Sequence, residues 1–122
     1  MTIHERVITS HFVDGQPNVN VYAEKKLGPG NIPHNYRITA EDKHTCQIHF
    51  QEGPVKDVGI NGITHEALLA VLRDRLLHFQ AGSYACTEND VALHHISSAI
   101  AALNCRTEKR IIRNNTEGRS EK

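Results

Sequence analysis

Residues 63–113 read ITHEALLAVLRDRLLHFQAGSYACTENDVALHHISSAIAALNCRTEKRIIR, and this stretch decides the fold. In its first part apolar residues recur at helical spacing, which predicts a helix that follows the N-cap Thr64 and is closed by Gly82 in the left-handed conformation. A second helix is expected to be capped by Thr87. Its apolar stripe comprises Ala92, Ile96, Ala99, Ile100 and Leu103. Because the link between the helices is short, the sequence predicts two antiparallel neighbours, a helical hairpin.

Residues 1–58 are typical of a small antiparallel sheet, because short, partly alternating segments are separated by turn sequences. The turn sequences are Asp14-Gly15, Pro17-Asn18 and Gly28-Pro29-Gly30-Asn31, and the expected strands are residues 3–13, 19–23, 36–39 and 45–51. The loop at residues 25–31 lacks the spacing of a phosphate-binding fingerprint, so an exposed turn is expected there rather than an anion site.

Together these patterns predict an α+β protein. We expect residues 1–59 to form the antiparallel β portion, residues 60–115 to form a helical hairpin that binds ligand and dimerises, and residues 116–122 to form a tail. The chain has 122 residues and no Trp, which is enough for one domain with a modest core of aliphatic side chains. Oligomerisation would add to such a core.

Charge and cysteine content limit the classes of function. With 14 basic and 14 acidic residues the formal net charge is zero, which argues against a general binder of duplex DNA. Three sparse cysteines and a polar N-terminus indicate a cytoplasmic protein with reduced thiols and no signal peptide. No apolar run approaches the roughly 20 residues that cross a bilayer, so the sequence predicts a soluble protein without a membrane partner.

Metal binding and catalysis receive no support from the sequence. His44, Cys46 and His49 are the closest set of metal-ligand types, but in a strand His49 faces the side opposite to the other two. No local context selects an activated pair of cysteine and histidine. We therefore expect no metal, no cofactor and no catalytic residue, although an enzyme is unsupported rather than excluded.

The end of the second helix is strongly basic. Arg106, Lys109, Arg110 and Arg113 fall within eight positions, and Arg106 and Arg110 stand four apart, on one face of a helix. The flat guanidinium fork fits two phosphate oxygens at a time, so this pair is a candidate anion site. The alternative is that these cations only offset the helix dipole and solubilise the tail.

The turn between the helices offers a second group of candidates. Phe79 ends the first helix, Tyr84 lies in the turn, and Asn89 lies in the first turn of the second helix. Aromatic faces and a side-chain amide suit the recognition of adenine by stacking and paired hydrogen bonds. Alternatively, Phe79 and Tyr84 simply fill the tip of the hairpin, and both roles are compatible.

Helix geometry limits how the two groups can combine. Asn89 and Arg106 are 17 residues apart on one helix, or about 25 Å at 1.5 Å per residue. A nucleotide cannot bridge that distance. If two hairpins pair about a two-fold axis, however, the tip of one lies near the basic end of the other, and two equivalent shared sites result. The narrow alanine-rich segment at residues 99–102 suits close helix approach, either within the chain or between two copies.

Several runs resemble phage Thoeris anti-defence proteins of the first type, which share a helical hairpin with anti-CBASS nucleotide sponges. The runs are GINGITHEALL (59–69), FQAG (79–82), ACTEN (85–89) and RTEKR (106–110), with KLGPGN (26–31) and FQEGPV (50–55) matching the sheet portion. The resemblance covers most of residues 20–118.

The resemblance implies a sponge that binds cyclic ADP-ribose isomers made by bacterial TIR proteins, chiefly glycocyclic ADP-ribose, in the cytoplasm of the infected cell without hydrolysing them. It implies that Phe79 and Asn89, with Tyr84 as a stacking face, contact the base and ribose side of the ligand. Arg106 and Arg110 would hold the diphosphate. Some relatives also bind cyclic di- or trinucleotides in a hexamer, so a homodimer or a hexamer is expected. The rival functions are an enzyme that degrades the same signal and a nucleic-acid-binding regulator.

Overall fold

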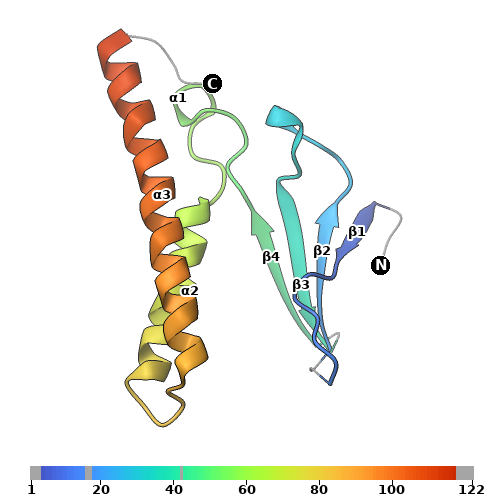
Figure 1. Ribbon diagram of the computed structural model, residues 1–122. Helices are drawn as coiled ribbons and strands as arrows, with labels where there is room; N and C mark the ends of the chain where they lie inside the picture. Colours follow the sequence, from blue (N-terminus) through green and yellow to red (C-terminus); the bar gives the residue numbers. More distant parts are fainter. Residues whose placement is uncertain (1–3, 16–17, 42, 118–122) are drawn as a thin grey trace. The chain divides into compact units, whose positions relative to one another are not determined.

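The structure is a computed structural model that describes residues 4–15, 18–41 and 43–117. The chain divides into two compact units, Met1–Ile63 and Thr64–Lys122. The first unit carries a four-stranded antiparallel sheet and the second carries two long helices (Figure 1). The α+β class predicted from the sequence is therefore confirmed.

The strands follow one another in space in the order β1-β2-β3-β4, and each pair is antiparallel (Figure 1). Their bounds are β1 (Glu5–Ile8), β2 (Val19–Glu24), β3 (Asn35–Ala40) and β4 (His44–His49). The first predicted segment, residues 3–13, was too long, because the chain turns after Ile8 and the Phe12 N–H donates to the Thr9 carbonyl oxygen over 3.1 Å. Predictions at residues 3, 17 and 118–122 lie outside the described residues.

The sheet has one apolar and one polar face, as the alternation of side chains along a strand requires. Val21 pairs with Ile38 on the apolar face. On the polar face Tyr22 pairs with Arg37, whose guanidinium carbon lies 4.4 Å from the Tyr22 ring centroid. Arg37 also donates two hydrogen bonds to the Glu5 carboxylate, over 3.1 and 2.9 Å. These contacts tie β1, β2 and β3 together on the polar face.

The glycine-rich loop between β2 and β3 is a turn, as expected. It contains the short 3-10 helix η1 (Pro29–Asn31), in which Gly30 has φ 79° and Asn31 has φ 61°. The buried side chain of His34 forms a hydrogen bond through Nε2 to the Pro29 carbonyl oxygen over 3.0 Å. That bond closes the loop onto the start of β3.

The connection from β4 to the second unit is a closed loop that the sequence did not predict. It contains one helical turn, α1 (Val55–Val58). The Gln51 amide donates to the carbonyl oxygens of Gly53 and Gly59 and accepts from the Asn61 N–H, over 2.8 to 3.2 Å. The Asn61 amide in turn bonds the backbone N–H and C=O of Glu52, over 2.9 and 2.8 Å. Two side-chain amides therefore satisfy backbone groups that have no strand partner.

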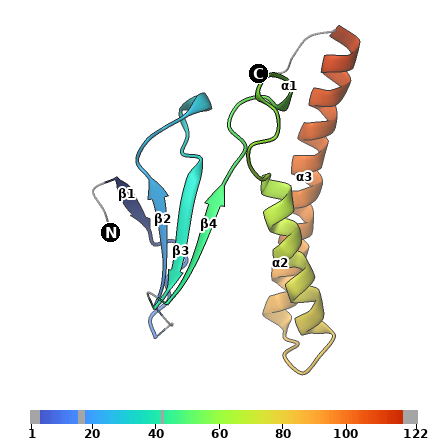
Figure 2. The same cartoon turned by 180° about the vertical axis from the view of Figure 1, so that it is seen from behind.

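The helices of the second unit are α2 (His65–Gln80) and α3 (Thr87–Glu117), which run side by side and are joined by a short turn (Figure 2). The Thr64 Oγ1 accepts from the Ala67 N–H over 3.1 Å, which confirms Thr64 as the N-cap of α2. The start of the second helix was predicted one residue late. Thr87 is already helical, and the Cys86 carbonyl oxygen accepts from the Asp90 N–H over 3.4 Å.

The predicted closing role of Gly82 was wrong. α2 ends at Gln80, and its C-cap residue Ala81 has the ordinary right-handed conformation, with φ −84°. Gly82 does not have a positive φ, and its N–H donates to the Phe79 carbonyl oxygen over 3.2 Å. A left-handed residue is unnecessary because the Gln80 side chain, described below, binds the turn that follows.

We predict opposite outcomes for two glycine-to-alanine substitutions. A Cβ at Gly62 would lie 2.4 Å from the Phe50 carbonyl carbon, so Gly62→Ala forces two backbone segments apart and should lower the free energy of unfolding by about 1–3 kcal/mol. A Cβ at Gly82 would approach nothing closer than 3.7 Å, so Gly82→Ala should be neutral or slightly stabilising. Urea denaturation measures both. A clear loss of stability in Gly82→Ala would contradict the right-handed turn.

Candidate functional site

The tip of the hairpin is held together by the Gln80 side chain. Its Nε2 donates to the Cys86 carbonyl oxygen over 2.9 Å and to Asp90 Oδ1 over 2.7 Å. Its Oε1 accepts from the Cys86 N–H over 3.0 Å. One residue at the end of α2 thus binds both backbone groups of the residue that precedes α3. Sequence reasoning missed Gln80, because an amide at a helix end carries no signal of its distant partners.

The three tip residues named by the sequence are neighbours in the structure. The ring centroids of Phe79 and Tyr84 are 5.8 Å apart, and the rings are tilted by 44°. Asn89 Nδ2 donates to the Tyr84 carbonyl oxygen over 3.3 Å, which leaves its Oδ1 as an acceptor. Phe79 and Asn89 are half-buried, whereas Tyr84 is 75% exposed. The tip therefore combines an accessible aromatic face with a fixed amide.

The basic end of α3 lies beside the start of α2. Thr107 Oγ1 donates to Glu66 Oε2 over 3.0 Å, so residues at the start of α2 meet residues near position 106 of α3. Arg106 and Arg110 are both exposed. Within the described part of the chain, neither guanidinium donates a hydrogen bond to another residue. Their donors are available to a ligand.

Glu66 is a carboxylate of α2 that faces this basic end. Partial burial acts to raise the pKa of its carboxyl. The hydrogen bonds from its own backbone N–H and from Thr107, together with the positive charge of Arg106 and the contribution of His65, outweigh burial and lower the pKa below the ordinary value of 4.5. Glu66 is therefore an anion at neutral pH that attracts Arg106 toward α2.

The two groups of candidate residues lie at opposite ends of the hairpin. The tip carries Phe79, Tyr84 and Asn89, while Arg106 is one residue before the Thr107 contact with the start of α2. α3 then continues to Glu117, beyond the point where α2 begins (Figures 1 and 2). The separation of about 25 Å expected along α3 is therefore present within one subunit. The structure does not bring the two groups together in a single chain.

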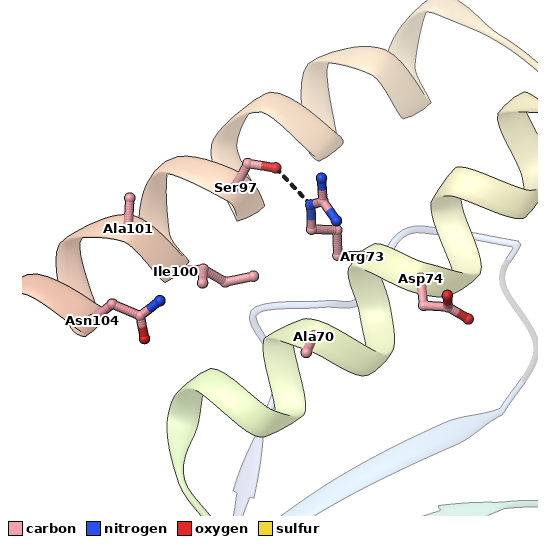
Figure 3. A pocket seen from close by; sticks show the side chains of 7 residues that line it. All are labelled: Ala70, Arg73, Asp74, Ser97, Ile100, Ala101 and Asn104. Atoms are coloured by element: carbon pink, nitrogen blue, oxygen red, sulfur yellow. Dashed lines mark hydrogen bonds between the residues drawn. The ribbon is translucent and has the colours of Figure 1, made fainter. Parts of the chain in front are cut away.

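A shallow groove of about 540 Å³ opens between the middle parts of α2 and α3 (Figure 3). It is lined by Ala70, Arg73, Asp74, Ser97, Ile100, Ala101 and Asn104, and so by none of the five predicted site residues. Arg73 reaches across it and donates from Nε to Ser97 Oγ over 3.0 Å. Because Asp74 lies in the same groove, the cation and the carboxylate offset each other, and the groove is a poor anion site.

Both helices leave apolar side chains uncovered. Within the described residues of the hairpin no side chain is fully buried. The exposed apolar residues include Val71 at 64%, Leu72 at 46%, Leu77 at 42% and Val91 at 51%. Two helices can cover only one stripe of each other, so part of the apolar surface stays exposed. No helix in the described part of the chain is both long enough and apolar enough to span a membrane.

No group of three or more His, Cys, Asp or Glu side chains in the described residues is arranged to hold a metal ion. The groups at the two ends of the hairpin are aromatic rings, an amide and guanidinium groups. They can stack on a base and donate to phosphate oxygens.

The family model of the Acb2/Tad1 hairpin domain matches residues 42–108, which is more than half of the chain. The chain belongs to the Acb2/Tad1 hairpin family. It is also similar to Thoeris anti-defense 1 of Bacillus phage SBSphiJ7, with 33% identity over 117 residues that cover 92% of this chain and 79% of that relative. The resemblance to phage anti-defence proteins that the sequence indicated is thereby confirmed.

We predict that the contact between Glu66 and Thr107 makes the stability of this hairpin depend on pH. Because the folded state holds the pKa of Glu66 below its unfolded value, the carboxylate stabilises the fold above about pH 4.5, and this contribution disappears as the pH falls through the folded pKa. Glu66→Gln keeps an oxygen that can accept from Thr107 but removes the charge.

Thermal unfolding of both proteins between about pH 7 and about pH 3 tests this. The wild type should have the higher midpoint at pH 7, and the difference should shrink toward pH 3. A difference that stays constant across the range would mean that the charge of Glu66 has no part in holding α2 to α3.

Proposed function

We propose that this protein is a phage anti-defence sponge, which binds a cyclic ADP-ribose signal made by bacterial TIR proteins and withholds it from its effector without hydrolysing it. Glycocyclic ADP-ribose is the proposed ligand. The observation that carries the proposal is the pairing of a tip suited to a base with a basic end suited to a diphosphate, on one antiparallel hairpin. Membership of the Acb2/Tad1 hairpin family and similarity to a protein named Thoeris anti-defense 1 support the anti-defence role.

The tip suits the base and ribose side of such a ligand. Phe79 and Tyr84 offer aromatic faces for stacking, and Tyr84 is exposed enough to be reached from solvent. Asn89 Oδ1 can accept from an amino or hydroxyl group of the ligand while its Nδ2 remains bound to the Tyr84 carbonyl oxygen. This bond fixes the amide before a ligand arrives, which reduces the entropy lost on binding.

The basic end suits the diphosphate. Arg106 and Arg110 are exposed, four residues apart and on one face of α3. Each guanidinium can donate two parallel hydrogen bonds to phosphate oxygens. The attraction between Arg106 and the Glu66 carboxylate restrains the arginine near α2 and also competes with the ligand for it.

A complete site requires a second subunit, because one chain separates the two groups by about 25 Å. In an antiparallel pair of hairpins related by a two-fold axis, Phe79, Tyr84 and Asn89 of one subunit face Arg106 and Arg110 of the other. The uncovered apolar residues of α2 and α3 support such an association. A homodimer is the smallest assembly that satisfies this geometry, and a hexamer built from such dimers satisfies it as well.

The chemistry of the proposed site favours sequestration over hydrolysis. Stacking rings, an amide and guanidinium groups bind a ligand but provide neither an activated nucleophile nor a general base. The Glu66 carboxylate at the basic end has a lowered pKa, which makes it a weaker base. Cyclic di- or trinucleotides, which share phosphate and base groups with the proposed ligand, are further candidates for binding.

The first test combines binding with recovery of the ligand. Arg106→Ala and Arg110→Ala should each weaken binding of glycocyclic ADP-ribose in calorimetry by at least about tenfold, because each removes charge-assisted hydrogen bonds from the diphosphate. Ligand released by heat from the wild-type complex should be chemically intact on chromatography. ADP-ribose among the released products would identify an enzyme, and steeply salt-dependent binding of DNA without binding of the nucleotide would favour a nucleic-acid regulator.

The second test asks whether the site is shared between subunits. Asn89→Ala removes the amide from the tip, and Arg106→Ala removes a guanidinium from the basic end, so at ligand concentrations near the wild-type Kd each variant alone should stay largely unoccupied. When the two are unfolded together and refolded as a mixture, about half of the dimers contain one subunit of each kind, and each of these has one intact site. About a quarter of the total binding capacity should therefore return. No recovery, in a mixture that exchanges subunits, would mean that each site lies within one chain.

A further inference from the structure

Arg75 is a charged residue at the tip that the predicted site does not include. It stands one helical turn before Phe79 on α2, and its guanidinium carbon lies 5.1 Å from the Phe79 ring centroid. That distance is within the range of a cation–π contact. Because Tyr84 packs on the same ring at 5.8 Å, Phe79 has an arginine and a tyrosine as its two neighbours at the tip.

The contact with the ring leaves most donors of Arg75 available. A guanidinium carries five N–H groups, and a ring satisfies few of them. Arg75 is exposed, and in the described residues it donates no hydrogen bond to another side chain or carbonyl. The carboxylates nearby have other partners: Asp90 accepts from Gln80, and Asp74 lies 3.6 Å from His78 Nδ1.

A ligand that stacks on Phe79 comes close to the Arg75 guanidinium, because the guanidinium lies over the same ring. A base in van der Waals contact with Phe79 either shares the ring with Arg75 or displaces it. In both arrangements the long, flexible arginine side chain can turn its remaining donors toward a phosphate of a compact cyclic nucleotide.

We propose that Arg75 is a third arginine of the nucleotide site, supplied by the same subunit as Phe79, and that it binds a phosphate of the ligand. The inference rests on the proposed function and deepens it. The partner's Arg106 and the partner's Arg110 hold the diphosphate from one side, and Arg75 holds it from the other. Three cations around a ligand with two negative charges make the site selective for diphosphates over uncharged nucleosides.

Arg73 provides a matched control. It is two residues before Arg75 on α2, so it projects about 200° away around the helix. Its Nε is bound to Ser97 Oγ in the groove between the helices (Figure 3). Arg73→Gln and Arg75→Gln remove the same charge from the same helix, but only Arg75→Gln removes it from the tip.

The test is calorimetric titration of glycocyclic ADP-ribose into wild type, Arg75→Gln, Arg75→Lys and Arg73→Gln, each at low and high salt. Arg75→Gln should weaken binding about tenfold and reduce its salt dependence, because one charge no longer acts on the phosphates. Arg75→Lys should restore part of the affinity and all of the salt dependence, and Arg73→Gln should match the wild type.

Three outcomes overturn the inference. Equal affinity and equal salt dependence in wild type and Arg75→Gln would show that the guanidinium does not touch the ligand. Equal losses in Arg73→Gln and Arg75→Gln would assign the effect to the general charge of α2. If the wild type itself does not bind the ligand, the proposed function fails and this inference fails with it. Thermal unfolding of the four proteins checks that the variants fold alike.

Discussion

The antiparallel packing of α2 against α3 is the constraint on which the rest of the protein depends. It brings the start of α2 to the basic end of α3, where Thr107 donates to Glu66, and it leaves Phe79, Tyr84 and Asn89 at the far tip. A rigid helix of this length does not bend to bring its ends together. The site we propose would therefore have to be built between subunits, and binding of a nucleotide would then be coupled to association of the hairpins.

A single hairpin leaves many of its apolar side chains exposed to solvent. This exposure is consistent with coupling between nucleotide binding and association of the hairpins. None of its described side chains is fully buried, and Val71, Leu72 and Val91 are among its exposed apolar residues. Polar contacts at both ends, from Gln80 at the tip and Glu66 at the base, fix how the two helices meet. The apolar surface that remains is the surface on which we propose that two copies associate. A sponge gains from this arrangement, because a pocket closed between two rigid surfaces withholds a ligand from water and from its effector.

The proposed site uses charge and stacking without a reactive group. Arg75 over Phe79 shows that the tip carries its own cation, so in the proposed shared site positive charge would face the ligand from both subunits. Glu66 acts in the opposite sense, since its ionised carboxylate attracts Arg106 in the absence of a ligand. In the proposed site the balance between these charges would set how strongly a diphosphate is preferred.

The sequence by itself determined the α+β class, the N-cap at Thr64, the β2, β3 and β4 segments and the hairpin, because periodicity, capping and turn residues act between near neighbours in the chain. It also indicated the family through runs of residues that a family model later matched. It missed the closed loop held by Gln51 and Asn61, the bonds of Gln80 to the turn, and the cation over Phe79. It also assigned Gly82 a left-handed conformation that the structure does not have. Which amide reaches which carbonyl, and which cation lies over which ring, depends on distances through space, and only the tertiary structure decided them.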